Sequence, residues 1–360
     1  MLTDVKAISS VIKVFGLFFV AFACAMATTP ILTHYLYKYQ LWRKTVRHTS
    51  PDGGTTPIFA SLHKDRETGV PRMGGVLIWV VPCILALALW ILSMLTDISF
   101  WKKANFLSRN QTWLPLFVML ASSLLGLADD LYQVVQRRDH IVKASGGVKF
   151  RHRLLIIFLI ALAGAWWFYD KLGWRTLYIP GLGDVFIGWW YIPLFVGTML
   201  ALFSSSVIDG IDGLAGGVFA SIFAAYGGIA FFRGQIDLAS FAAVVMGALL
   251  AFLWFNIPPA RFYMGESGIL GLTTALTVLA FLTDSVVVLP IIGLVLLLEV
   301  ASNLIQFFAK YFLGRKIFLV APIHHHYEAL GWPPYKVTMR FWVISTAMAI
   351  LGMAIALIGR

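Results

Sequence analysis

The chain has 360 residues, of which 59% are hydrophobic and only 12% are charged, whereas soluble domains carry about 25% charged residues. A compact water-soluble fold cannot bury that much apolar surface, so the composition excludes a soluble enzyme, a disordered regulator and a disulfide-stapled secreted domain. The formal net charge is +11. We therefore expect a polytopic membrane protein with helical spans, because the apolar stretches are continuous rather than alternating.

About ten stretches approach the ~20 residues that a bilayer-spanning helix needs. In chain order they centre near Phe19, Pro82, Phe117, Leu159, Phe195, Phe223, Val245, Ala275, Leu294 and Ala349. The segment from Gly173 to Trp190 is rich in Gly, Trp and Tyr, which favours a position at the membrane interface. No internal repeat or linker is evident, so we expect one all-α membrane domain that comprises residues 1–360.

The first apolar stretch has two interpretations. Lys6 and Lys13 precede it and small residues follow at 25–27, which resembles a cleavable signal peptide. The stretch is long for a signal peptide, however, and it continues to Ile31. These features favour an uncleaved first span.

Positive charge is distributed unevenly among the loops that join these stretches. The odd-numbered loops contain 19 of the 28 Lys and Arg residues, and the even-numbered loops with the two termini contain the other 9. Short cytoplasmic loops collect Lys and Arg, so we predict that the odd-numbered loops are cytoplasmic and both termini extracytoplasmic. Basic loops suit anionic lipid and a multiply anionic substrate. No soluble basic domain is present to bind nucleic acid.

Four polar clusters fall on the odd-numbered loops or at the adjoining span ends: Gly126–Asp130, Asp209–Gly213, Met264–Gly268 and Ala321–Glu328. Acidic residues beside a span are costly and need a reason. Adjacent carboxylates such as Asp129 and Asp130 suit Mg²⁺, which pairs oxygen ligands with phosphate oxygens. Each cluster alone could be a solvated helix end, a tight turn or a helix-start acid. Their shared place on one predicted membrane face favours a common site.

The last cluster contains three consecutive histidines, His324 to His326, with Glu328 two residues beyond them. In a soluble protein this pattern would suggest zinc, but neighbouring side chains rarely reach one ion and Cys ligands are absent. The cluster fits a hydrogen-bonding rim for phosphate or sugar better, with a histidine able to titrate near neutral pH. A polar loop at the membrane surface is the plainer alternative.

Together these motifs resemble the polyprenyl-phosphate N-acetylhexosamine-1-phosphate transferases. The residues that carry the resemblance are Pro71–Gly75, Asp129-Asp130, Ile208–Ala215, Phe255-Asn256 and Met264–Glu266. Ala321–Glu328, followed by Gly331–Pro333, is similar to the hallmark of the phospho-N-acetylmuramoyl-pentapeptide transferase branch. The resemblance covers essentially the whole chain.

The resemblance implies that phospho-MurNAc-pentapeptide passes from UDP-MurNAc-pentapeptide to undecaprenyl phosphate, giving lipid I and UMP in peptidoglycan synthesis. It further implies Mg²⁺, a homodimer and a multi-pass position in the bacterial inner membrane with the active site facing the cytoplasm. The active-site loops would lie near residues 35–72, 129–153, 209–213, 256–267 and 309–340. Two alternatives stay open: a sister transferase that uses another UDP-sugar, which Arg72 favours, and a membrane transporter. Because the acids gather at span ends rather than at the midplane, the transporter is disfavoured.

Residue roles also follow from the resemblance. Asp129, Asp130 and Glu266 are expected to hold the metal and, with His325, to act in catalysis; Asp129 is the preferred proton acceptor. A two-step route through a carboxylate nucleophile stays open. Glu266 stands where the family usually has Asp, and Tyr263 where it has the Phe that stacks on uracil. Substrate binding is expected from Arg72, Asp209, Gly210, Ile211, Asp212, Asn256, Tyr263, Gln306, His324 and His326.

Overall fold

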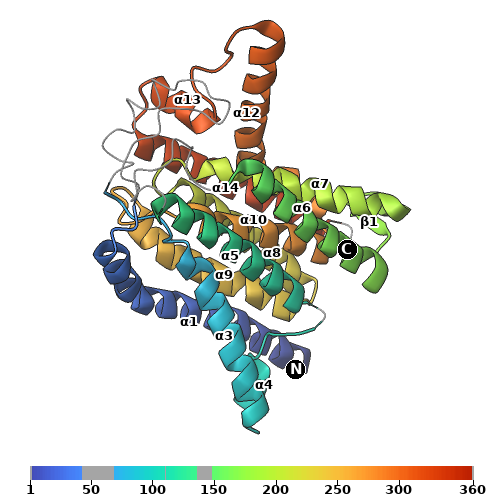
Figure 1. The fold of residues 1–360 in the computed structure, drawn as a ribbon. Coiled ribbons are helices and arrows are strands. Elements are labelled where there is room, and N and C mark those ends of the chain that lie inside the picture. Colours follow the sequence, from blue (N-terminus) through green and yellow to red (C-terminus); the bar gives the residue numbers. More distant parts are fainter. Residues whose placement is uncertain (1, 43–68, 110, 136–147, 359–360) are drawn as a thin grey trace.

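The computed structural model describes residues 2–42, 69–109, 111–135 and 148–358 (Figure 1). Within these ranges, ten helices are long and apolar enough to cross a membrane. Each contains one of the ten predicted centres, so the number and type of the spans are confirmed. The ninth helix begins at Leu294 instead of centring there, because Gly293 interrupts the apolar run that starts at Val286. Hydropathy alone cannot place that break.

The helices are, in chain order, α1 (Leu2–Lys38), α3 (Val76–Leu95), α4 (Ser99–Ala104), α5 (Trp113–Val135), α6 (Phe150–Trp166), α7 (Tyr191–Ser204), α8 (Leu214–Phe232), α9 (Ile236–Asn256), α10 (Gly265–Leu282), α11 (Leu289–Ile292), α12 (Leu294–Leu313), α13 (Ile323–Ala329) and α14 (Pro334–Leu357). Short π and 3₁₀ turns flank several of them: η1 (Trp167–Lys171), η2 (Gly188–Trp190), η3 (Ser205–Ile208) and η4 (Val286–Val288).

One departure from the all-α prediction is a small antiparallel hairpin. Strands β1 (Thr176–Ile179) and β2 (Gly183–Phe186) pair with Ile179 opposite Gly183. The turn between them contains Pro180 and Gly181, and Gly181 has φ +84°, a conformation that favours glycine. The hairpin lies in the predicted interfacial segment, and the Pro-Gly pair was the signal for it.

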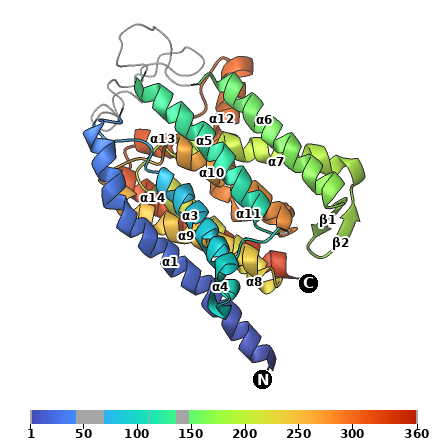
Figure 2. The same ribbon diagram turned by 60° about the horizontal axis from the view of Figure 1, so that its bottom comes forward.

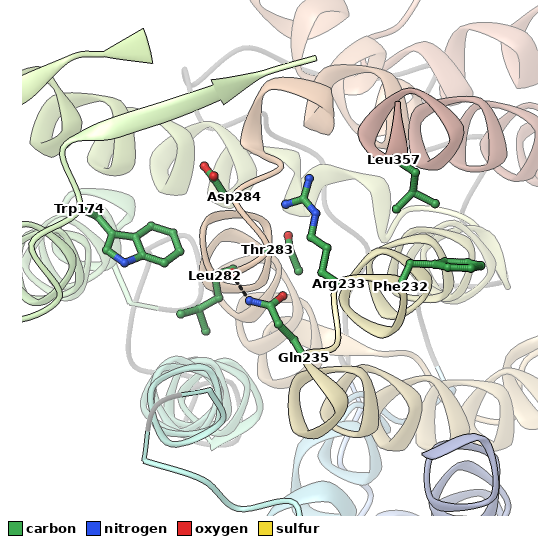
Figure 3. A pocket seen from close by; sticks show the side chains of 8 residues that line it. All are labelled: Trp174, Phe232, Arg233, Gln235, Leu282, Thr283, Asp284 and Leu357. Carbon is green, nitrogen blue, oxygen red and sulfur yellow. Dashed lines mark hydrogen bonds between the residues drawn. The ribbon is translucent and has the colours of Figure 1, made fainter. Parts of the chain in front are cut away.

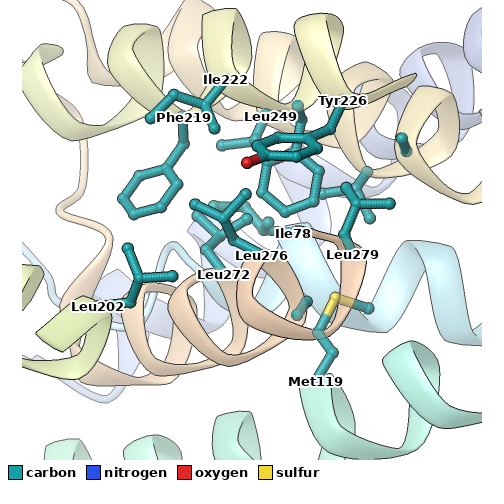
Figure 4. Close-up of a cluster of buried hydrophobic side chains, with 14 of the residues drawn as sticks. Ile78, Met119, Leu202, Phe219, Ile222, Tyr226, Leu249, Leu272, Leu276 and Leu279 are labelled. Atoms are coloured by element: carbon teal, nitrogen blue, oxygen red, sulfur yellow. The ribbon is translucent and has the colours of Figure 1, made fainter. Parts of the chain in front are cut away.

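Helix α10 lies at the centre of the bundle, and every residue from Ser267 to Leu282 is buried. It packs against α5, α3, α7 and α8, while α9 packs between α1 and α8 (Figures 1 and 2). Side chains of α3, α5, α7, α8, α9 and α10 meet in this core, among them Ile78, Met119, Leu202, Tyr226, Leu249 and Leu276 (Figure 4). The central helix is therefore held on all sides, which fixes the position of its N-terminus.

The two ends of the chain lie together at one end of the bundle, away from α13 (Figure 2). Near the N-terminus, Lys13 Nζ donates to Asp237 Oδ1 at 2.7 Å. Near the C-terminus, the Ala356 carbonyl accepts from Arg233 Nη2 at 3.1 Å. Arg233 directly follows α8 and Asp237 lies in the first turn of α9, so the α8–α9 connection marks the end where the termini lie.

The outer half of α12 projects from the bundle, and α13 lies beside its base (Figure 1). Aromatic residues of this half are exposed, with Tyr311 76% and Phe312 70% accessible. The chain then returns toward the bundle through α13, which carries the three histidines. This connection brings the histidine motif back to the ends of the other helices.

Candidate active site

The predicted acidic clusters meet at the bundle end where α5 finishes and α10 begins. Asp130 Oδ1 accepts from the Glu266 N–H at 3.2 Å, and Asp130 Oδ2 accepts from the Ser267 N–H at 2.9 Å. Asp209 Oδ2 accepts from the Gly265 N–H at 3.1 Å. Three clusters that are far apart in the sequence are thus joined directly. The structure therefore brings three of the four predicted clusters together at one end of the bundle.

Two glycines make this junction possible. Gly265 has φ +70°, and a Cβ there would lie 2.5 Å from Asp130 Oδ2. A Cβ on Gly126, one turn before the aspartate pair, would lie 2.1 Å from the Glu266 carbonyl oxygen. Side chains at either position would overlap atoms of the other helix, so only glycine lets α5 and α10 approach so closely.

The N-terminus of α10 explains why carboxylates gather there. The first N–H groups of a helix lack partners within the helix and carry partial positive charge, which favours anions. Asp130 and Asp209 accept these N–H groups, and Glu266 lies in the first turn. Such a helix end is also suited to bind phosphate.

Two arginines neutralise the carboxylates. Arg153 Nη1 lies 3.0 Å from Asp129 Oδ2 and 2.7 Å from Glu266 Oε1, so one nitrogen bridges two acids. Arg72 Nε lies 3.7 Å from Asp130 Oδ1. Buried carboxylates need such partners, because an uncompensated charge is costly in a poorly solvated site. Arg153 was not among the predicted site residues; its place at the start of a span was the available signal in the sequence.

The donor set fits Mg²⁺ as an ion shared with substrate. Glu266 Oε2 is buried and has no hydrogen-bond partner in the structure. Asp129, by contrast, accepts from Gln133 Nε2 at 2.9 Å, from the Val148 N–H and from Arg153. Within the described ranges, no three His, Cys, Asp or Glu side chains lie close enough to hold one ion. Mg²⁺ commonly uses one or two carboxylates with water and phosphate oxygens, so Glu266 suits it without an all-protein cage.

Both positive and negative groups surround the carboxyl of Asp209. Burial raises the pKa of its carboxyl to about 7, since a poorly solvated site disfavours the charged form. The Arg72 cation and the Gly265 N–H oppose this shift, whereas the charges of Glu266 and Asp130 add to it. Asp209 therefore gains or loses its proton near neutral pH.

The histidine motif reaches the same site through two carboxylates. His324 Nδ1 lies 2.7 Å from Glu299 Oε2, and His325 Nδ1 lies 2.7 Å from Glu328 Oε2. Both imidazoles turn their Nε2 atoms toward Gly210, where a Cβ would lie 2.4 Å from that of His324 and 3.0 Å from that of His325. Glu299 was not among the predicted site residues, although an acidic residue within an apolar span was a signal in the sequence.

The third histidine faces elsewhere. Successive residues of a helix rotate by about 100°, and His326 Nδ1 accepts from the Leu319 N–H at 3.2 Å. Gln306 also holds this connection, because its Oε1 accepts from the N–H groups of Ile317 and Phe318 and its Nε2 donates to the Phe318 carbonyl. Both residues therefore shape the segment before α13, and contact with substrate stays a prediction for them.

Asn256 and Asp212 brace the loops around the site. Asn256 Oδ1 accepts from the Gly213 N–H at 3.0 Å, and its Nδ2 donates to the Phe262 carbonyl at 2.9 Å. Asp212 Oδ2 accepts from the Ala260 N–H at 3.1 Å. These bonds tie the turn before α8 to the loop before α10, so both predicted binding residues set the shape of the site.

The remaining predicted residues frame the site. Tyr263 is half-buried, and its N–H and C=O groups bond to Pro71 and Gly74 of the segment that carries Arg72. Ile211 is buried in the core. Of the predicted active-site loops, residues 43–68 and 136–147 lie outside the described ranges.

Comparison with known proteins agrees with these motifs. Residues 112–284 match Glycosyl transferase family 4. Phospho-N-acetylmuramoyl-pentapeptide transferases are similar over most of the chain: 36% identical in Geobacillus sp. (strain WCH70), covering 81% of this chain and 85% of that protein. The protein of Pelagibacter ubique is 33% identical and covers 92% of this chain and 89% of its own length. The protein of Chloroflexus aurantiacus is also 33% identical and covers 93% of this chain and 88% of its own length. The chain belongs to the phospho-N-acetylmuramoyl-pentapeptide transferase family.

Proposed function

We propose that this protein transfers phospho-MurNAc-pentapeptide from UDP-MurNAc-pentapeptide to undecaprenyl phosphate, forming lipid I and releasing UMP. Family membership supports the reaction class. The observation that carries the proposal is the meeting of Asp130, Asp209 and Glu266 at the N-terminus of α10, beside the His324–Gly210 contact. An anion-handling site at the end of apolar helices suits one lipid and one water-soluble substrate.

Phosphoryl transfer depends mainly on positioning and on neutralising phosphate charge. Arg72, Arg153 and the N–H groups at the start of α10 provide positive charge at the site. Mg²⁺, when bound by Glu266 with Asp129 nearby, would neutralise the pyrophosphate oxygens of the nucleotide. The chain itself then orients the two substrates.

Asp129 is the proposed acceptor of the proton from the lipid phosphate. Asp130 accepts two backbone N–H groups of α10 and so serves to hold that helix. Asp129 instead bonds to the side chains of Gln133 and Arg153, besides the Val148 N–H. Side chains can move aside for a substrate more readily than helix backbone, which favours Asp129.

We also assign the site to the cytoplasmic face of the bacterial inner membrane, with both termini on the other side. The basic odd-numbered loops support this orientation, and the termini lie at the bundle end away from α13. A homodimer is part of the proposal on the strength of the family resemblance. Light scattering of the purified protein tests this proposal by measuring the molecular mass of the particle in solution.

The test supplies the purified chain with undecaprenyl phosphate, Mg²⁺ and either UDP-MurNAc-pentapeptide or UDP-GlcNAc, and measures UMP. We expect UMP with the first nucleotide only. Release with UDP-GlcNAc alone would assign the chain to the sister transferases, and no release with either nucleotide would reopen the transporter alternative. Asp129→Asn should abolish release. Asp97→Asn is the matched control, since Asp97 is fully exposed and pairs with Lys102 away from the site.

A further inference from the structure

Helix α14 connects the two ends of the bundle. At the end where the chain termini lie, Arg233 Nη2 donates to the Ala356 carbonyl at 3.1 Å. The next residue, Leu357, lines a cavity of about 750 Å³ together with Arg233 (Figure 3). At its other end, α14 follows α13, the helix that carries the histidines. Rigid elements position a site most precisely, so the first turns of α14 are suited to hold groups of the candidate active site.

Two side chains of α14 donate hydrogen bonds to the aspartate turn (Asp209–Gly213). Thr338 Oγ1 donates to the Asp212 carbonyl at 3.1 Å, and Trp342 Nε1 donates to the Gly213 carbonyl at 3.1 Å. A Cβ on Gly213 would lie 3.5 Å from Thr338 Cγ2 and from Trp342 Cζ2. Because residues four apart share one face of a helix, these two donors contact the turn as a pair.

The bond from Thr338 differs from those of other threonines in the bundle. A helical Thr can return its hydroxyl to a carbonyl three or four residues earlier, as Thr274 and Thr277 of α10 do. Thr338 donates instead to a different element, and its side chain is buried. This hydroxyl therefore fixes the turn rather than its own helix.

The bond from Trp342 depends on a glycine of α8. A Cβ on Gly217 would lie 2.1 Å from Trp342 Nε1, so the indole can reach the Gly213 carbonyl only because residue 217 has no side chain. Asn256 Oδ1 accepts from the Gly213 N–H at 3.0 Å. Helix α9 thus holds the N–H of Gly213, and α14 holds its carbonyl.

The same part of α14 contacts the helix that carries the histidines. Phe341 lies between the two donors in sequence, and its buried ring meets Tyr327 of α13 edge-on, with 6.1 Å between the ring centroids. Tyr327 directly follows the three histidines. At the start of the aspartate turn, Gly210 faces the Nε2 atoms of His324 and His325. Helix α14 therefore contacts both partners of this approach.

We propose that Thr338 and Trp342 are positioning residues for the transfer reaction: they hold the aspartate turn at its distance from the histidine pair. The inference rests on the proposed function, in which Asp209, Gly210 and Asp212 bind the nucleotide substrate. Thr338 and Trp342 act through the turn, by way of the two carbonyls that accept from them.

The test compares Thr338→Val with Thr338→Ser in the purified full chain. Valine keeps the shape but removes the donor, so the KM for UDP-MurNAc-pentapeptide should rise about tenfold, as expected for the loss of one neutral hydrogen bond. The kcat should also fall, because the substrate is displaced from its reactive geometry. Serine keeps the hydroxyl and should restore most of both losses. A smaller folded fraction alone would lower kcat and leave KM unchanged.

Thr346→Val is the matched control. The Thr346 hydroxyl bonds to Ser221 Oγ at 3.0 Å, also between α14 and α8, but eight residues farther along α14 than Thr338. This variant loses a similar bond away from the turn and should keep the wild-type KM. Equal KM values in Thr338→Val and Thr346→Val would overturn the inference. A wild type that releases no UMP would instead overturn the proposed function.

The indole N–H signal of Trp342 gives a measurement that does not depend on activity. Its absence from the ¹H–¹⁵N NMR spectrum of Trp342→Phe identifies the signal. Gly217→Ala should shift it, because the added methyl group would lie 2.1 Å from Nε1 and must displace the indole. The same variant should raise the KM for UDP-MurNAc-pentapeptide. A shifted signal with an unchanged KM would show that the indole does not position the turn.

Discussion

His324 and Glu299 are both fully buried and lie 2.7 Å apart, Nδ1 to Oε2. A carboxylate on Nδ1 fixes the tautomer and the direction of an imidazole. The free edge of His324 is thereby directed at Gly210, where its Nε2 is buried and has no hydrogen-bond partner in the structure. Glu299 is therefore a positioning residue for the histidine, one step removed from the substrates.

Replacing Glu299 by Gln should lower the rate of UMP release roughly tenfold to a hundredfold, as the loss of partners that orient histidines does elsewhere. The ¹⁵N NMR signals of His324 should report a changed tautomer at the same time. Glu299→Asp keeps the charge and should restore part of the rate. Unchanged ¹⁵N signals in Glu299→Gln would show that the carboxylate does not set the imidazole.

Gly210→Ala should displace the imidazoles of His324 and His325 and lower the rate of UMP release. The new methyl group would lie 2.4 Å from His324 Nε2 and 3.0 Å from His325 Nε2, so at least one imidazole must move. A displacement of about 1 Å in a catalytic site can cost about a hundredfold in rate. Gly197→Ala is the control, because no atom lies within 4 Å of the added Cβ there. Equal UMP release by the two variants would contradict this geometry.

The Asp209 carboxyl should titrate near pH 7 in the protein without Mg²⁺. Difference infrared spectroscopy measures this as a protonated-carboxyl band that is absent in Asp209→Asn. Arg72→Gln should move the midpoint to higher pH, because the Arg72 cation favours the ionised form. A midpoint that stays near pH 4 would refute the burial of this group.

The same shift predicts a pH effect on stability. The folded state holds the Asp209 proton more tightly than the unfolded chain does. Protonated Asp209 therefore adds its full contribution to the free energy of unfolding below the unfolded pKa of about 4, and this contribution is lost as the pH rises through about 7. At pH 8, Asp209→Asn should therefore unfold at a higher temperature than the wild type. Thermal unfolding followed by tryptophan fluorescence measures the difference.

Glu266→Gln should raise the Mg²⁺ concentration needed for half-maximal UMP release by about tenfold or more, because it removes the charge from a carboxylate whose buried Oε2 has no hydrogen-bond partner among the described residues. Glu266→Asp keeps the carboxylate, with the side chain that the family resemblance leads us to expect at this position, and should retain most of the rate. A Glu266→Gln protein with normal Mg²⁺ dependence would place the ion elsewhere.

The sequence predicted the helices and the meeting of the acids, but not the groups that hold them. Span length and the bias of Lys and Arg toward alternate loops sufficed to place Asp130, Asp209 and Glu266 on one face. The bridging role of Arg153 and the pairing of Glu299 with His324 depend on which helices pack together. The divergence of His326 from its neighbours likewise depends on the short helix that carries it. The sequence marks Arg153 only as a charge at the start of a span and Glu299 only as an acid within one, and neither feature identifies a partner.

The close contact between Gly126 and α10 restricts which amino acids can occupy position 126. Even a methyl group at that position would overlap the Glu266 carbonyl, and no rotamer can relieve an overlap at Cβ. We therefore expect that any single-nucleotide change which replaces Gly126 by another amino acid would impair the protein. A saturation library under selection for growth would return glycine alone, and an inhibitor that fits against this contact would meet no escape mutation there.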